Sequence, residues 1–131
     1  MAFVLYNANP FRNNTIDCVI RAISFSMNED WDSTYMKLAL RGFELKAPME
    51  VNYVWGSYLK SNGYKRYIIP NTCPDCYTIA EFCKDNPKGD FILTTGTHVV
   101  AVRDGNYYDT GDSGNEVPIY FWTKETNIKE A

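Results

Sequence analysis

A cysteine, a histidine and an aspartate occur in an order that could support nucleophilic catalysis by a thiol. Cys18 follows Asp17 at the predicted start of a helix, and His98, the only histidine of the chain, opens an apolar run that continues to Val102. Asp109 ends the next predicted strand. The first turn of a helix stabilises a thiolate, an imidazole can shuttle a proton, and an acid can orient that imidazole. We therefore interpret Cys18 as a candidate nucleophile, His98 as its base and Asp109 as the residue that orients His98.

Two asparagines stand just ahead of the predicted helix and could complete such a site. Attack on a carbonyl creates an oxyanion that must be held by hydrogen-bond donors. The backbone N–H of Cys18 is one candidate donor, and the side-chain amide of Asn13 or Asn14 is another. These residues define the predicted oxyanion site.

Each of the three residues also has an ordinary structural interpretation. Free cysteine is among the most buried residue types, so Cys18 could be a core residue. His98 could make a hydrogen bond without taking part in catalysis. Asp109 begins a segment rich in turn-forming residues, in which Asp112 is a competing acid. The order of all three along the chain is what favours the catalytic interpretation.

The hydrophobic periodicity predicts which elements position these residues. Helices are predicted over residues 18–27, 32–43 and 49–61, with a short fourth helix after the capping box formed by Thr78 and Glu81. Strands are predicted over 64–69, 91–95, 98–103, 106–109 and 117–122, and the segment before residue 15 is predicted to be extended or loop. Helices followed by an antiparallel sheet indicate an α+β fold.

Four local signals refine this prediction. Asp17 is the expected N-cap of the first helix, and helical spacing places Arg21 on the face opposite its apolar residues. Strand alternation places His98 on the same face as Val100. The pair Asp104-Gly105 predicts a tight hairpin.

Composition limits the classes of function. The chain has 131 residues, which indicates one domain, predicted over 1–122 with a charged tail over 123–131. A net charge of −3 makes a nucleic-acid partner a poor expectation. The N-terminus lacks the basic segment of a signal peptide, and no window approaches the roughly 18 apolar residues of a membrane span. We expect a cytoplasmic protein that does not bind membranes.

The remaining cysteines allow other interpretations. Cys73 and Cys76 are separated by two residues, and Cys83 follows. They could belong to an ordinary turn, to a dithiol redox site, or to a zinc site completed by Cys18 or His98. The sequence leaves these three alternatives open.

The pattern as a whole resembles a known family. Asp17-Cys18 at a helix start, the run from Gly96 to Val102, and Tyr108-Asp109 are similar to motifs of papain-like cysteine peptidases. Within that class the chain looks like the small bacterial peptidases that cleave bacteriocin leaders after a double glycine. It also resembles small uncharacterised proteins from phages and Firmicutes.

This resemblance implies a papain-like fold, in which N-terminal helices, one bearing the nucleophile, pack on a C-terminal antiparallel sheet. It further implies a Cys18, His98 and Asp109 triad that needs no metal or cofactor. The chain departs from the peptidases at Arg12, where they carry a glutamine, and at Val19, where they carry a small residue.

We therefore expect a thiol hydrolase that cleaves a peptide or isopeptide amide in a peptide or protein substrate. The setting would be a bacterial cytoplasm, or the host cytoplasm if the protein is encoded by a phage. One alternative is a phage or bacterial factor that binds a protein on the same fold without cleaving it. The other is a zinc-stabilised interaction module.

Overall fold

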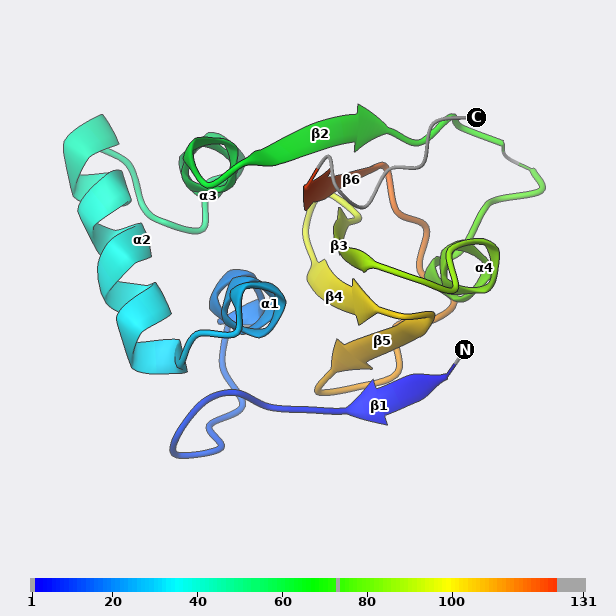
Figure 1. Cartoon of the computed structure of the whole chain (residues 1–131), viewed down its shortest axis with the longest axis horizontal. Coiled ribbons are helices and arrows are strands. Elements are labelled where there is room, and N and C mark those ends of the chain that lie inside the picture. Colours follow the sequence, from blue (N-terminus) through cyan, green and yellow to red (C-terminus); the bar gives the residue numbers. More distant parts are fainter. Residues whose placement is uncertain (1, 73, 125–131) are drawn as a thin grey trace.

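The computed structural model describes residues 2–72 and 74–124, which form a mixed α+β fold (Figure 1). The helices are α1 (Cys18–Met27), α2 (Trp31–Leu45), α3 (Asn52–Ser61) and α4 (Ile79–Asp85). The strands are β1 (Phe3–Leu5), β2 (Tyr64–Ile68), β3 (Asp90–Thr94), β4 (Val99–Arg103), β5 (Asn106–Asp109) and β6 (Tyr120–Lys124). They form one sheet in the order β1-β5-β4-β3-β6-β2, antiparallel except for the β1–β5 pair.

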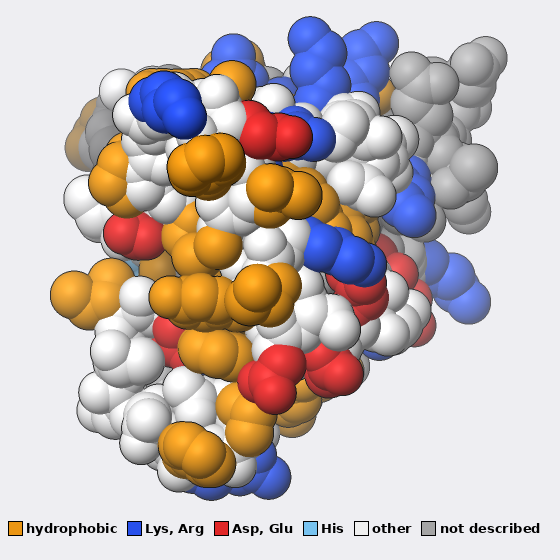
Figure 2. Space-filling model, turned by 90° about the vertical axis from the view of Figure 1, so that its left-hand side faces the viewer, with side chains coloured by type: hydrophobic (Ala, Val, Ile, Leu, Met, Phe, Trp, Pro, Cys, Tyr) orange, Lys and Arg blue, Asp and Glu red, His pale blue; other side chains and the backbone are white. Residues whose placement is uncertain are grey.

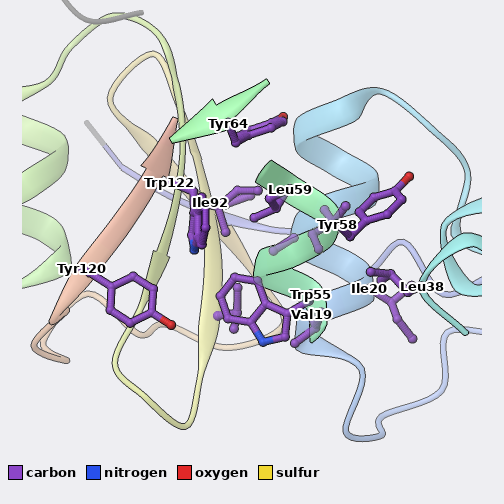
Figure 3. Close-up of a cluster of buried hydrophobic side chains, with 14 residues drawn as sticks. Val19, Ile20, Leu38, Trp55, Tyr58, Leu59, Tyr64, Ile92, Tyr120 and Trp122 are labelled. Atoms are coloured by element: carbon purple, nitrogen blue, oxygen red, sulfur yellow. The ribbon is translucent and has the colours of Figure 1, made fainter. Parts of the chain in front are cut away.

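Helices cover both faces of this sheet. In Figure 1, α1 and α3 lie between the sheet and α2, while α4 lies on the opposite face. Strand β4 explains why the core has two parts, because its side chains alternate between faces. Val99 and Ala101 join the cluster beneath α1, which Figure 3 shows, whereas Val100 and Val102 join the cluster beneath α4. A strand buried on both faces reads as one unbroken apolar run, as this one does.

Several predicted signals are confirmed. Helix α1 has the predicted bounds and ends where Asn28 adopts a left-handed conformation. The capping box of Thr78 and Glu81 is present at the start of α4. Asp104 and Gly105 have φ angles of 50° and 79°, as a tight hairpin between β4 and β5 requires.

Other boundaries differ for identifiable reasons. The N-terminal segment contains β1, which pairs with β5, a contact between distant parts of the chain that local patterns do not reveal. The last strand begins at Tyr120, because Pro118 has no N–H to donate to a ladder. It runs to Lys124, so the buried Thr123 belongs to the sheet and not to the predicted tail. The rest of that tail, residues 125–131, lies outside the described residues.

Helix α3 also begins later than predicted. Residues 48–51 form a turn in which the Val51 N–H donates to the Pro48 carbonyl, and the helix starts at Asn52. The close approach of α2 accounts for the turn, since a Cβ at Gly42 would lie 2.5 Å from the carbonyl oxygen of Ala47. The chain therefore leaves α2 tightly before it enters α3.

The outer surface of α2 carries exposed apolar side chains. Met36, Leu40 and Phe43 are 67%, 57% and 70% exposed and occupy one side of the helix at helical spacing. Figure 2 shows hydrophobic side chains gathered on this side of the molecule. None of the described helices has the length and apolar character needed to cross a bilayer.

Candidate active site

Cys18 is the first residue of α1 and faces the beginning of β4. The helix packs directly on that strand, and the thiol is half-buried between them. Its sulfur interacts with the side chain of His98 and with the backbone of Val99 through hydrogen bonds. The packing of α1 on the sheet thus brings together two residues that are far apart in the sequence.

His98 lies one residue before β4, in a tight connection from β3. The Thr95 N–H and the Thr94 hydroxyl both donate to the His98 carbonyl at 3.0 Å. The His98 N–H in turn donates to the Thr95 hydroxyl at 3.2 Å. These bonds fix the backbone on which the imidazole is carried.

The predicted facing of His98 is wrong. Strand alternation would group it with Val100 and Val102, which lie in the cluster beneath α4. His98 instead reaches Cys18 of α1, and 27% of its side chain is exposed. The physical reason is that His98 precedes the ladder, so the pleat of β4 does not determine its direction.

Asp109 ends β5 and holds the other side of the imidazole. Its Oδ2 lies 2.6 Å from Nε2 of His98, and the residue is only 2% exposed. The pairing of Ala101 with Tyr108 brings the end of β5 beside the start of β4. Since Nε2 is engaged with Asp109, Nδ1 is the ring nitrogen left to face Cys18.

The ionisation of the three groups is coupled. Burial by itself raises the pKa of Cys18, but hydrogen bonds from His98 and Val99 and the charges of His98 and Arg21 together outweigh burial, so the thiol pKa is lowered. The hydrogen bonds with Asp109 and then Cys18 raise the pKa of His98 to about 10. Burial opposes ionisation of Asp109, yet bonds from His98 and Ser113 lower its pKa to about 2. These shifts favour a thiolate paired with an imidazolium.

Sequence reasoning missed a buried ion pair beside these residues. Arg21, expected on the outer face of α1, is buried and donates from Nε to Asp17 at 2.7 Å and from Nη1 to Asp109 at 3.1 Å. Asp17 precedes α1 as predicted, but its side chain does not cap the helix. The four-residue spacing of Asp17 and Arg21 was a usable signal for their pairing.

The predicted oxyanion asparagines lie in the exposed loop before α1. The Asn13 carbonyl accepts a bond from Asn7, and Asn14 helps to line an open, mainly apolar pocket of about 540 Å³. The other residues lining this pocket are Leu5, Tyr6, Asn7, Arg12 and Thr110. The role of Asn13 and Asn14 as oxyanion donors stays a prediction.

A much smaller pocket of about 20 Å³ borders Cys18 itself. It is lined by Ile16, Asp17, Cys18, Val19, Ile20, Met49 and Glu50. Asp17 leaves the first-turn N–H groups of α1 without a side-chain cap. These groups point toward the end of the helix where Cys18 lies.

Of the other described cysteines, Cys83 lies on the opposite face of the sheet. Cys83 is free and buried beneath α4, and Cys76 is disulfide-bonded. Cys73 lies outside the described residues. Within the described ranges, no group of three or more His, Cys, Asp or Glu side chains is arranged to hold a metal ion. The zinc and dithiol interpretations stay hypotheses.

Comparison with known proteins provides no further assignment: no family model, curated protein or solved structure matches the chain. The geometry of Cys18, His98 and Asp109 is therefore the basis for assigning a function.

Proposed function

We propose that this protein is a papain-like cysteine peptidase that hydrolyses a peptide or isopeptide amide. Cys18 is the nucleophile, His98 the general acid and base, and Asp109 the residue that orients and charges His98. The observation that carries the proposal is the bond of 2.6 Å between Asp109 and Nε2 of His98, with Cys18 facing the same ring.

The first half of the reaction forms an acyl-enzyme. The Cys18 thiolate attacks the amide carbonyl carbon, and the carbonyl oxygen becomes an oxyanion. The N–H of Cys18, together with Asn13 or Asn14, holds this oxyanion. His98 then gives its proton to the leaving nitrogen, the carbon–nitrogen bond breaks, and a thioester remains on Cys18.

The second half releases the acid. Neutral His98 takes a proton from a water molecule as the water oxygen attacks the thioester carbonyl. Collapse of this intermediate breaks the carbon–sulfur bond, which leaves a carboxylic acid product and restores the Cys18 thiolate beside the His98 imidazolium. No metal or cofactor takes part in either half.

Three features of the site support this proposal. The thiol pKa is lowered although the thiol is half-buried. The helix start that carries it has N–H groups without a side-chain cap. The α1 helix packs on a mainly antiparallel sheet, the arrangement that the family resemblance implies.

The direct test is hydrolysis of a complex peptide mixture in water enriched in ¹⁸O. We expect new C-termini that carry one ¹⁸O atom, and mass spectrometry identifies the cleaved bonds. Cys18→Ser should abolish these products, while Cys83→Ala should leave them unchanged. Products that persist in Cys18→Ser, or their absence with the wild-type protein, would contradict the proposal.

A protein-binding role without cleavage is the second candidate. The exposed apolar row of Met36, Leu40 and Phe43 on α2 favours it, since such a row can serve as a contact surface (Figure 2). Under this alternative, Cys18→Ser would retain every function, and no ¹⁸O-labelled product would form.

A further inference from the structure

Arg21 lies between two buried carboxylates in a row of charged groups that ends at the reactive pair. In spatial order, the row consists of Asp17, Arg21, Asp109, His98 and Cys18, whose charges alternate in sign when the pair is ionised. Arg21 is 8% exposed, and the two carboxylates beside it are 4% and 2% exposed. Buried charges are retained only where partners compensate them, so this row behaves as one unit.

The two oxygens of Asp109 have separate partners. Oδ1 accepts from Arg21 at 3.1 Å and from the Thr110 N–H at 2.7 Å. Oδ2 accepts from His98 at 2.6 Å and from the Ser113 hydroxyl at 2.7 Å. Because all four partners are donors, the carboxylate is held in one orientation with Oδ2 toward the imidazole.

Arg21 is also one of three donors that hold the Asp17 side chain, and the others are Trp31 and Asn9. Its Nε bond of 2.7 Å, together with a bond of 3.0 Å from the Trp31 indole, holds that carboxylate away from the helix start. An uncommitted aspartate at this position normally caps the first-turn N–H groups. Such a cap would take the N–H of Val19 or Ile20, next to the Cys18 N–H that the proposed mechanism uses for the oxyanion.

We propose that Arg21 is a positioning residue that acts on both ends of the site. Its Nη1 group orients Asp109 toward His98, and its Nε group helps to hold the Asp17 side chain away from the N–H groups beside Cys18. The proposal rests on the proposed function, because it treats Cys18 and His98 as the reacting pair. A lysine cannot make both contacts, since it lacks the planar fork of donors.

The test compares Arg21→Lys with Arg21→Met. The matched control is Arg103→Lys, because Arg103 pairs with Asp90 elsewhere on the sheet. The first readout is the titration of the His98 ring by NMR, in which a single histidine gives an unambiguous signal. The second is the pH dependence of Cys18 alkylation by iodoacetamide, which reports the thiolate. The charged groups near this pair are Arg21, Asp109, Asp17 and Glu50, and the two Arg21 variants change only the first.

We expect Arg21→Lys to lower the His98 pKa and to raise the Cys18 pKa, each by about one unit. At a pH below the Cys18 pKa, the fraction of thiolate should then be about tenfold lower. In the hydrolysis assay, kcat should fall by more than KM rises. Because Arg21 still holds Asp109, Asp17→Asn should leave the His98 titration near that of wild type. The same substitution should lower kcat. Arg103→Lys should change none of these values.

Profiles for Arg21→Lys that coincide with those of Arg103→Lys would overturn the positioning role. If Arg21→Met does not fold, Arg21→Lys decides the question, because it keeps the buried charge. If the wild type proves unable to hydrolyse peptides while the two titrations still shift in Arg21→Lys, the proposed function fails and the orientation of Asp109 by Arg21 stands.

Discussion

Two free thiols on opposite faces of one sheet have opposite ionisation behaviour. Cys18 lies on α1 and Cys83 on α4, and both sit in helices that pack against the sheet. Burial raises the pKa of Cys83 to about 11. Burial also acts on Cys18, yet His98 and Val99 reverse its effect and the pKa is lowered. The two sulfurs differ in depth, since Cys18 is half-buried and Cys83 fully buried, but it is the partners of Cys18 that reverse the sign of the pKa shift.

The surroundings of the two thiols explain this difference. Aromatic rings such as Phe82 and Phe91 pack around Cys83, where no ionised form is stabilised. Beside Cys18 the buried groups are polar, and they include Asp17, Arg21 and Asp109. Apolar packing stabilises both faces of the sheet, but only the α1 face adds buried polar groups beside its thiol, which can stabilise a thiolate and its imidazolium.

The largest expected effect comes from His98→Ala, which removes the partner that makes the two thiols differ. Loss of a general acid and base lowers rates by about 10²–10⁴-fold. We expect peptide hydrolysis to fall within that range, and the pH for half-maximal Cys18 alkylation to move upward toward that of Cys83. Unchanged hydrolysis would show that the histidine has no catalytic role.

Phe82→Ala should have a large effect on stability and none on the reactivity of Cys18. Phe82 is 3% exposed and packs against Phe91 and Phe121. Its truncation should lower the free energy of unfolding by about 3–5 kcal/mol, measured by urea denaturation. In the fraction that stays folded, the pH profile of Cys18 alkylation should match that of the wild type. A shifted profile would mean that the two faces are not independent.

The features that could be predicted from the sequence are those that depend on residues close together in the chain. Helix α1, the capping box at Thr78 and the hairpin at Asp104-Gly105 depend on neighbours in the chain, so their signals are local. The unbroken apolar run of β4 is likewise a local signal, typical of a strand that is buried on both faces. Cys18, His98 and Asp109 could be selected because their types and order fit one chemistry.

The remainder depends on contacts between distant segments. The parallel pairing of β1 with β5 links the two ends of the domain, and no local pattern encodes it. Helical spacing predicts Arg21 on the face opposite the apolar residues of α1, but the residue is buried there by its partner Asp109, which lies 88 residues away. The direction of the His98 side chain followed from a connection whose geometry only the folded chain defines.

Asp109→Asn should have an intermediate effect on the reactive pair. All four groups that face Asp109 are donors, so an amide must direct its own N–H₂ group at one of them. The His98 pKa should fall from about 10 toward 6.5. Because the leaving nitrogen needs a protonated His98, the alkaline limb of the hydrolysis profile should move to lower pH by about 1–3 units.

The same substitution changes stability with a defined sign. The pKa of Asp109 lies at about 2, below its ordinary 3.8, so its charge stabilises the fold above pH 3.8. That contribution is lost as the pH falls through about 2. As the pH decreases from 5 to 2, we expect the urea concentration at the midpoint of unfolding to fall less for Asp109→Asn than for the wild type. An equal loss in both proteins would show that Asp109 carries no shifted pKa.

Cys83→Ala should give the smallest effect. The change removes one buried sulfur from an apolar cluster, which lowers the free energy of unfolding by about 1 kcal/mol. Hydrolysis and the Cys18 alkylation profile should stay at wild-type values. A loss of hydrolysis in this variant, with the fold intact, would mean that Cys83 and not Cys18 is the reactive thiol.

The most direct test of the central claim is the pH dependence of iodoacetamide labelling at Cys18 and Cys83, the free thiols among the described residues, in one sample. Peptide mapping by mass spectrometry would separate Cys18 from Cys83 between pH 5 and pH 10. The account predicts that Cys18 reacts well below pH 9 and that Cys83 stays unlabelled throughout the range while the protein is folded. Equal labelling of the two cysteines, with the same pH dependence, would contradict a thiolate held by His98.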